Sequence, residues 1–212
     1  MRIGMLGSGV VAQTLAAGFL NKGYEVVVGT RSPDKLAAWG AAHPGVRITG
    51  VAEAAAEGEL LVLAAKGTAA SAMLRAAGAV NLAGKVVIDT TNPIADAPPV
   101  NGVLKFFTTL DDSLIERLQR EFPDARFVKA FNSVGNALMV DPELDGGPPT
   151  MFICGNDGTA RAAVSQILTQ FGWQTSDLGH AEAARAIEPL CMLWCIPGFL
   201  RNDWRHAYKV LS

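Results

Sequence analysis

Hydrophobic positions in this chain fall into short aliphatic runs that alternate with longer segments of helical composition. Residues 1–6 form an apolar run, residues 7–23 are rich in small residues after a glycine-containing turn, and residues 24–30 are rich in valine. A strand buried on both faces reads as such a continuous run, whereas a helix needs a longer segment. The first 30 residues therefore predict strand, turn, helix and strand, which together make a βαβ unit.

The same alternation continues along the rest of the chain. Ser32 and Pro33 predict a helix start, because serine caps helices and proline fits the first helical position. The elements expected after residue 30 are a helix over 33–42, a short strand over 47–49, a helical turn over 51–56, a strand over 60–65, a helix over 68–79, a strand over 85–92, a proline-rich loop over 94–102, strands over 126–133 and 150–157, a helix over 158–171, a strand over 173–179 and a helical region from about residue 181.

One further helix is predicted before residue 126. Leu110, Leu114, Leu118 and Phe122 recur at helical spacing. This helix must end before Pro123, because proline lacks the N–H group and clashes with the preceding turn of a helix.

Unbroken alternation of strands and helices favours an α/β fold with a doubly wound, mostly parallel sheet. We therefore expect a Rossmann-type fold with a C-terminal helical region. The sequence shows no linker, repeat or low-complexity tract. The expectation is one domain over residues 1–212, in which residues 150–212 form a C-terminal extension that completes the sheet and the binding pocket.

Composition and charge narrow the range of partners. With 18 basic and 20 acidic residues and a net charge of −2, the chain gives no electrostatic reason to expect nucleic acid or an anionic membrane surface as a partner. The three cysteines lack zinc-type spacing, so no metal site is expected. No secretory signal precedes the first strand, and Pro197 interrupts the longest C-terminal apolar run. We expect a cytoplasmic protein that binds small molecules.

The turn after the first strand carries a nucleotide-binding pattern, GSGVVA over residues 7–12. In this pattern Gly7 permits a tight turn, Gly9 lets the backbone approach a pyrophosphate, and Ala12 stands where a third glycine would pack the helix on the sheet. Free N–H groups at the helix start then bind the phosphate charge. A plain strand-to-helix turn is the alternative, but the strand before and the helix after it favour a dinucleotide site.

The end of the second strand lacks the carboxylate that NAD-binding domains carry there. Such domains have Asp or Glu about 20 residues after the glycines to bind the ribose hydroxyl, whereas this chain has Thr30, Arg31 and Ser32. A guanidinium matches a phosphate, two hydroxyls add donors, and Lys35 supplies a further charge. The pattern favours NADP(H) over NAD(H); a solvated loop cation at Arg31 and a simple helix cap at Ser32 are the alternatives.

Several longer stretches resemble one family. They are GSGVVAQTLAAGFLNKGYEVVVGTRSPDK, DTTNP, VKAFNSVGNAL, FICGND and LGHAEAARAIEPL, which begin at residues 7, 89, 128, 152 and 178. These stretches are similar to the coenzyme F420-dependent NADP oxidoreductase family, and they also look like the soluble reductase domain of the six-transmembrane epithelial antigen metalloreductases. The resemblance covers nearly the whole chain. Its VKAFNS and ICGND segments are more specific than the glycine loop, which many families share.

The resemblance implies where NADP would lie. It implies contacts from the glycine loop at Ser8, Gly9, Val10 and Val11, a 2′-phosphate site at Thr30, Arg31 and Ser32, and a nicotinamide side formed by Ala65, Lys66, Asn92, Pro93, Ala130 and Asn132. Together with Gly7 and Lys35, these are the expected cofactor-binding residues. The implied nicotinamide contacts follow strands, where a doubly wound sheet binds its ligands. For Lys66, a solvent-facing loop lysine is the alternative.

The resemblance also implies the reaction, which is hydride exchange between NADP(H) and a deazaflavin, coenzyme F420, or a flavin. Such a transfer depends on aligning two rings, so it works without a catalytic side chain, and none is assigned. Two alternatives stay open: reduction of a small carbonyl or imine, and an NADP-binding sensor without turnover. Residues 188–199 are similar to a C-terminal helix that can contribute to a dimer contact, so a homodimer is a further expectation.

Overall fold

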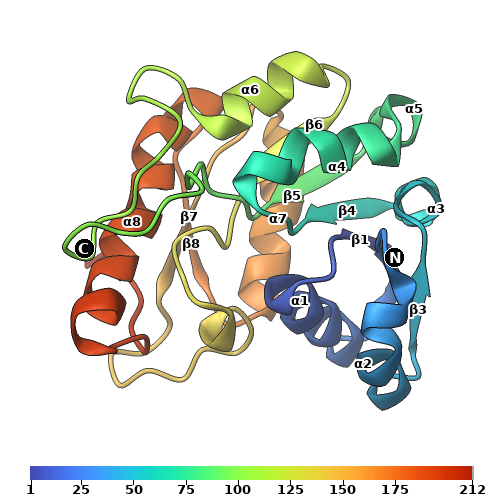
Figure 1. Cartoon of the computed structure of the whole chain (residues 1–212), viewed down its shortest axis with the longest axis horizontal. Helices are drawn as coiled ribbons and strands as arrows, with labels where there is room; N and C mark the ends of the chain where they lie inside the picture. The colour runs from blue at the N-terminus through green and yellow to red at the C-terminus, as the bar shows by residue number, and fades with distance from the viewer. Residues whose placement is uncertain (212) are drawn as a thin grey trace.

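A six-stranded parallel sheet forms the centre of the molecule. The structure is a computed structural model that describes residues 1–211. Its strands are β1 (Arg2–Leu6), β2 (Glu25–Gly29), β3 (Val46–Thr49), β4 (Leu60–Leu63), β5 (Val86–Asp89) and β6 (Arg126–Lys129). They lie in the order β3-β2-β1-β4-β5-β6, with every neighbouring pair parallel. Figure 1 shows the sheet with helices around it. The strand order confirms the predicted Rossmann-type fold.

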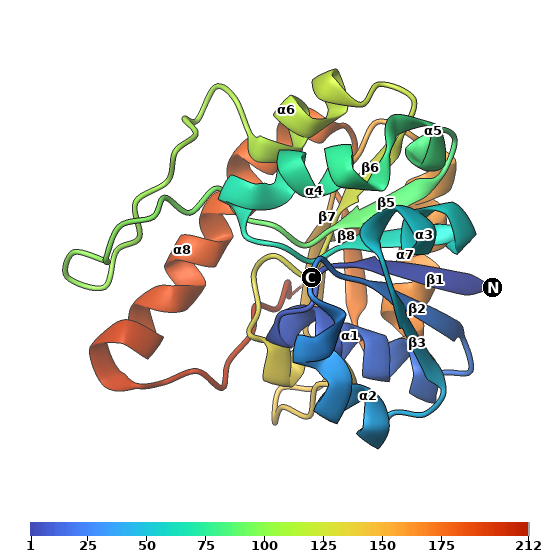
Figure 2. The same ribbon diagram turned by 45° about the vertical axis from the view of Figure 1, so that its right-hand side comes forward.

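Helices cover both faces of the sheet. They are α1 (Val10–Asn21), α2 (Ala37–Ala42), α3 (Val51–Glu57), α4 (Ala70–Ala77), α5 (Ala79–Leu82), α6 (Leu114–Glu121), α7 (Gly158–Gln170) and α8 (Ala184–Arg201), with short 3-10 turns at Pro33–Leu36, Gly67–Ala69, Asn136–Leu138 and Ala181–Ala183. Helices α1 and α7 pack on one face, and α3, α4 and α6 on the other. The segment between β5 and α6 runs as a long loop beside α8 (Figure 2).

Residues 150–211 attach to the sheet beyond β6. Strands β7 (Thr150–Ile153) and β8 (Gln174–Asp177) form a separate parallel pair. The N–H of Lys129 donates to the carbonyl of Cys154 at 2.9 Å, which makes an antiparallel bridge to β6. This segment therefore meets the main sheet through a bridge and adds a second small sheet, rather than a further strand of the main ladder.

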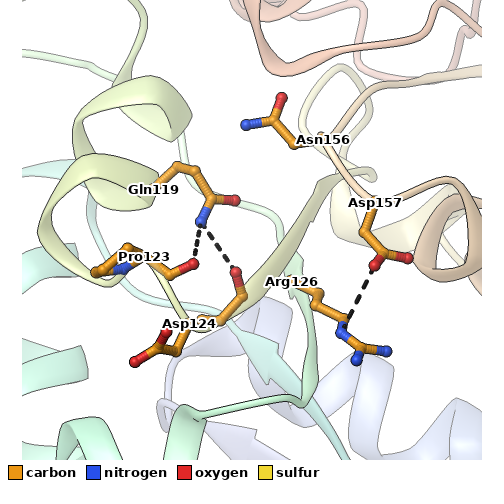
Figure 3. Close-up of a pocket in the computed structure, with 7 residues that line it drawn as sticks. Gln119, Pro123, Asp124, Arg126, Asn156 and Asp157 are labelled. Carbon is orange, nitrogen blue, oxygen red and sulfur yellow. Dashed lines mark hydrogen bonds and ion pairs between the residues drawn. The ribbon is translucent and has the colours of Figure 1, made fainter.

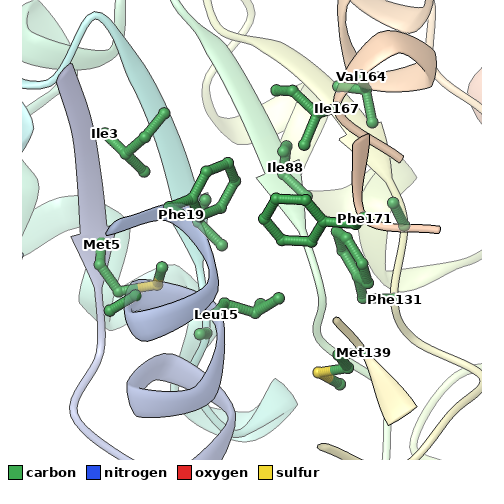
Figure 4. Close-up of a cluster of buried hydrophobic side chains, with 14 of the residues drawn as sticks. Ile3, Met5, Leu15, Phe19, Ile88, Phe131, Met139, Val164, Ile167 and Phe171 are labelled. Carbon is green, nitrogen blue, oxygen red and sulfur yellow. The ribbon is translucent and has the colours of Figure 1, made fainter. Parts of the chain in front are cut away.

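The C-terminal segment shares its hydrophobic core with the first βαβ unit. Phe19 of α1 and Phe171 after α7 are fully buried, with ring centroids 4.8 Å apart. Phe131 lies on the other side of Phe171, at 6.0 Å between centroids (Figure 4). Burying each phenylalanine contributes about 1.5–3 kcal/mol. This aromatic contact therefore fixes α7 against the sheet.

Helix α6 starts later than the apolar spacing predicts. Leu110 is 74% exposed and lies outside the helix, which begins at Leu114. The hydroxyl of Ser113 accepts the N–H of Glu116 at 3.3 Å, and the Glu116 carboxylate accepts the N–H of Ser113 at 2.9 Å. This reciprocal pair satisfies two N–H groups and sets the boundary. The predicted end before Pro123 is confirmed.

Strands β5 and β6 end earlier than predicted, at Asp89 and Lys129. Residues 90–92 and 130–132 are therefore loops at the carboxyl edge of the sheet rather than parts of strands. This difference matters for the site, because backbone groups outside the ladder are available to other partners.

Helix α8 continues to Arg201 through Pro189 and Pro197, so the expectation that Pro197 interrupts the apolar run is wrong. Within the described chain, Ala181–Arg201 is the one helical stretch long and apolar enough to cross a membrane by length and composition alone. A third of that stretch is buried in the protein, including Ile187 and Trp194. The core helix of a soluble protein passes the same test, so the finding is weak evidence for a membrane span.

Candidate functional site

The carboxyl ends of the parallel strands open into a cavity of about 720 Å³. Because neighbouring strands all run the same way, the loops after them leave the sheet at one edge. The cavity is lined by residues 7–11 after β1, Arg31 after β2, residues 64–67 with Ala69 and Met73 after β4, and residues 90–92 and 94–97 after β5. Its size lies in the range of sites for small-molecule ligands and cofactors.

The loop after β1 shows two different reasons for glycine. Gly7 has φ +141°, and a Cβ there would lie 2.1 Å from the carbonyl oxygen of Ala64, so this turn requires glycine. A Cβ on Gly9 would meet no protein atom within 4 Å. Protein packing therefore does not explain Gly9, and the space above it is open to a ligand. Helix α1 also starts without a side-chain cap or an acidic first turn, which leaves its N–H groups for an anion.

The loop after β2 places one cation at the cavity. Arg31 is exposed and lines it. Thr30 is 4% exposed, and its hydroxyl accepts the N–H of Ser32 at 3.1 Å, so Thr30 shapes the loop beneath Arg31. Ser32 makes no side-chain hydrogen bond to the 3-10 turn Pro33–Leu36, so the predicted serine cap is not formed. The reason is local: the first turn is 3-10, and Thr30 holds the backbone of Ser32.

The loops after β4 and β5 form the other half of the cavity. Gly67 lies so close to Asn92 that a Cβ on Gly67 would be 1.9 Å from the Asn92 carbonyl oxygen. Alanines and glycines dominate the wall here, which lets a ligand approach the backbone. The ionisable side chains that line the cavity are Arg31, Lys66 and Asp96, all exposed; histidine, cysteine and tyrosine are absent from its lining. A lining of this kind can bind and align a ligand.

Asn132 supports this half of the cavity from behind. The Asn92 amide donates to the carbonyl of Asn132 at 2.8 Å, and the Asn132 amide donates to Oδ1 of Asn92 at 3.2 Å and to the carbonyl of Ile187 at 3.0 Å. The preceding residue, Phe131, has φ +61°, a costly left-handed conformation for a bulky side chain. The strained backbone and the paired amides together fix Asn92, which lines the cavity.

The predicted cofactor-binding residues divide into two groups. Those that line the cavity are Gly7, Ser8, Gly9, Val10, Val11, Arg31, Ala65, Lys66 and Asn92. Those that lie outside its lining are Thr30, Ser32, Lys35, Pro93, Ala130 and Asn132. Pro93 and Ala130 are buried, so their positions support their neighbours rather than face the cavity.

Sequence reasoning missed several residues of the lining. Residues 94–97, expected only as part of a proline-rich loop, close one side of the cavity. They do so because the loop folds back: the N–H of Ala95 donates to the carbonyl of Lys105 at 2.8 Å. Thr90, Thr91 and Met73 were also missed. The available signal was that residues 90–97 directly follow a strand, where this fold places ligands.

A buried ion cluster lies directly beneath the cavity. The Lys129 ammonium is 2.7 Å from Oδ2 of Asp89 and 2.9 Å from Oε1 of Glu188, and it donates to the carbonyl of Thr91 at 2.8 Å. All three charged side chains are almost completely buried. Burial alone lowers the pKa of Lys129, but the two carboxylates outweigh it and raise that pKa above its ordinary value. Lys129 is therefore charged, with all three donors in use.

Helix α8 is joined to α6 through two carboxylates. Glu188 of α8 accepts the N–H groups of Leu114 and Ile115 at 2.9 and 3.1 Å, so it binds the positive end of α6. Glu116 of α6 accepts two hydrogen bonds from Arg185 of α8 at 3.0 and 2.6 Å. The hydrogen bond from Arg185 is the main cause that lowers the pKa of Glu116 to about 2.

A second hollow, of about 450 Å³, lies at the opposite edge of the sheet, beside the start of β6. The Gln119 amide donates there to the carbonyls of Pro123 and Ala125 at 3.4 and 2.9 Å. Nε of Arg126 is 3.6 Å from Oδ2 of Asp157 (Figure 3). Gln119, Arg126 and Asp157 thus have partners within the protein. In the described part of the chain no three His, Cys, Asp or Glu side chains are grouped to hold a metal ion.

Comparisons with known proteins match the chain to a family model, to solved structures and to curated relatives. A family model described as "NADP oxidoreductase coenzyme F420-dependent" matches residues 2–93. One similar crystal structure, from Arthrobacter sp. FB24, is provisionally described as an F420-dependent NADP reductase. It is 36% identical to this chain and has a TM-score of 0.94, and the match covers 100% of each chain. An imine reductase from Streptomyces aurantiacus has a TM-score of 0.70, and the match covers 94% of this chain and 63% of that one. Its sequence is 18% identical, so this similarity shows the fold alone.

Curated relatives are longer than this chain. Metalloreductase STEAP3 of Rattus norvegicus is 31% identical over 204 residues, which are 94% of this chain and 39% of that protein. Metalloreductase STEAP2 of Homo sapiens is 30% identical over 191 residues, 89% of this chain and 35% of that protein. The chain therefore spans less than two-fifths of the length of these curated relatives.

The contact between α6 and α8 predicts a pH-dependent stability. The pKa of Glu116 is lower in the folded protein than its ordinary 4.5, so its stabilisation is present above about pH 4.5 and is lost as the pH falls toward about 2. We expect Glu116→Gln to lower the free energy of unfolding by about 1–2 kcal/mol at pH 7, less than the full shift implies because Arg185 is 39% exposed and solvent screens the pair.

Urea denaturation from pH 7 to pH 3 measures this effect, and the difference from the wild type should shrink as the pH falls. Glu182→Gln, an exposed carboxylate near the start of α8, is the matched control and should change stability by less than about 0.5 kcal/mol. A loss for Glu116→Gln that is the same at pH 7 and pH 3 would show that the ion pair is not its source.

Proposed function

Because the chain belongs to the coenzyme F420-dependent NADP oxidoreductase family, we propose that it is an NADP-dependent oxidoreductase that exchanges a hydride between NADP(H) and a deazaflavin or a flavin. The single observation that carries this proposal is the cavity at the carboxyl edge of the sheet. It combines an uncapped helix start, a cation where NAD-binding domains have an acid, and a far half without a catalytic side chain.

We propose that the pyrophosphate binds at the first turn of α1. The open space over Gly9 and the uncapped N–H groups support this position, because together they accept both the bulk and the charge of a phosphate. The 2′-phosphate then lies at Arg31, the cavity residue that follows β2. A guanidinium pairs with a phosphate through two parallel hydrogen bonds, which explains a preference for the phosphorylated dinucleotide.

The nicotinamide half fits between the loops that follow β4 and β5. Ala65, Lys66 and Asn92 line this part of the cavity. When bound, NADP(H) supplies the chemistry of hydride exchange. The residues of the chain bind it, orient it and hold the second ring against it. Such alignment accounts for the rate of a hydride transfer without a proton donor, which agrees with the absence of histidine, cysteine and tyrosine from the lining.

We also propose a cytoplasmic homodimer. Leu193, Phe199 and Leu200 of α8 are 55%, 44% and 55% exposed, so this helix leaves large apolar side chains in contact with solvent. Covering this surface with a second copy would remove it from water. Sedimentation equilibrium that gives a monomer at micromolar concentration would exclude the dimer and leave the proposed reaction untouched.

Arg31 gives the first test of the cofactor. We expect Arg31→Ala to weaken NADPH binding by about tenfold to a hundredfold, since a hydrogen bond to a charged group contributes about 1.5–3 kcal/mol, and to change NADH binding little. Calorimetric titration of both ligands measures this. Arg31→Lys is the matched variant: it keeps the charge, loses the planar fork and should fall between wild type and Arg31→Ala. Equal losses for NADPH and NADH would refute the phosphate site at Arg31.

Transient kinetics identify the acceptor. We expect the NADPH-loaded protein to be oxidised rapidly by coenzyme F420, FMN or FAD, and not by a panel of small carbonyls and imines, since no histidine, cysteine or tyrosine lines the cavity and the ionisable Lys66 and Asp96 of its lining are exposed to solvent. Stopped-flow absorbance at the NADPH band follows each reaction. Rapid oxidation by a carbonyl or imine alone would replace the proposed reaction with direct substrate reduction. Tight NADPH binding without oxidation by any acceptor would point to a sensor.

A further inference from the structure

Three of the polar atoms of Thr91 are bonded to the buried ion cluster of Asp89, Lys129 and Glu188. The N–H and the hydroxyl of Thr91 both donate to Oδ1 of Asp89, at 2.9 and 2.7 Å, and its carbonyl accepts the ammonium of Lys129 at 2.8 Å. Thr91 follows β5 and lies outside the sheet ladder, so these contacts replace strand pairing there. The position of this loop thus depends on the cluster.

This loop is part of the cavity wall. Thr90, Thr91 and Asn92 all line the half assigned above to the nicotinamide. Asn92 is fixed in turn by Asn132, and Gly67 packs directly on its backbone. A shift of Thr91 would therefore carry Asn92 with it and open or narrow the cavity at its far half. The glycine loop and Arg31 come from β1 and β2, and they would not move.

A buried ion cluster is a poor source of stability. Removing charges from water costs several kcal/mol for each ion, and well-packed apolar side chains often replace such clusters without loss. One ammonium and two carboxylates also leave a net buried charge of −1, which the N–H groups of α6 and the N–H and hydroxyl of Thr91 offset. Stability thus does not explain the cluster, whereas three directed bonds to one loop residue give it a positional role.

We propose that Lys129 is a positioning residue for the nicotinamide half of the cavity. It acts by holding the carbonyl of Thr91, while Asp89 holds the N–H and the hydroxyl of the same residue. The inference rests on the proposed function, because it requires NADP(H) to occupy the cavity. Glu188 balances the ammonium and joins it to α6 and α8, but it does not touch Thr91. Lys129 and Glu188 should therefore have separable effects.

The test compares NADPH with 2′,5′-ADP, which carries the 2′-phosphate but no nicotinamide. Calorimetry gives the ratio of the two affinities for the wild type and for Lys129→Met. We expect the preference for NADPH over 2′,5′-ADP to fall about tenfold in Lys129→Met, with 2′,5′-ADP binding unchanged, because the wall beside the nicotinamide is no longer preorganised for it. Neither ligand requires the hydride acceptor to be known.

Lys129→Met leaves two carboxylates buried without their cation, which costs stability as a single change, so a second variant accompanies it. Lys129→Met with Glu188→Gln keeps the wild-type buried charge of −1 on Asp89 while removing the ammonium, and the same tenfold fall is expected. Two controls retain the bond to Thr91. Glu188→Gln alone and Arg185→Met, which breaks the neighbouring contact with Glu116, should lower stability without changing the ratio.

Each outcome separates the two proposals. An unchanged ratio of NADPH to 2′,5′-ADP affinity in the folded Lys129 variants would overturn the positioning role. Equal weakening of the binding of both ligands, or a wild type that does not prefer NADPH, would overturn it as well. The same fall in the Arg185→Met control would assign the effect to general loosening and overturn it too. A wild-type protein that binds neither ligand would instead refute the proposed function.

Discussion

Parallel pairing of all six central strands is the constraint on which the rest of this molecule depends. It brings the loops after β1, β2, β4 and β5 to one edge of the sheet. Four segments far apart in sequence therefore share one cavity. The helix that follows β1 adds unpaired N–H groups at that edge, and the loop after β2 adds a cation. Ligand binding follows from the direction of the strands before any particular side chain is considered.

The two halves of the cavity are held in different ways. The half beside Gly9 and Arg31 is formed by one βαβ unit, whose turn geometry and helix start are local properties of the chain. The other half is held from below by Lys129 and from behind by Asn132, with α8 joined to both through Glu188 and Ile187. The C-terminal helix therefore takes part in shaping a cavity that its own residues do not line.

The two halves of the cavity also differ in how far the sequence predicts them. The βαβ order, the glycine loop and the cation after β2 depend on residues close together in the chain, so periodicity and spacing predicted them. Leu110 was placed in α6 because apolar spacing outweighed the capping pair of Ser113 and Glu116, which sets the true start. The contacts of Asp89, Lys129 and Glu188 join positions far apart in the chain. No local sequence pattern predicts these contacts. Residues 94–97 were missed for a similar reason, because they line the cavity only where their loop folds back.

A crystal structure of the protein with NADPH bound tests the central claim most directly. The account predicts the pyrophosphate against the N–H groups of the first turn of α1, the 2′-phosphate within hydrogen-bonding distance of the Arg31 guanidinium, and the nicotinamide between the loops after β4 and β5, beside Thr91 and Asn92. A dinucleotide bound in the reverse direction, or with its 2′-phosphate away from Arg31, would contradict it.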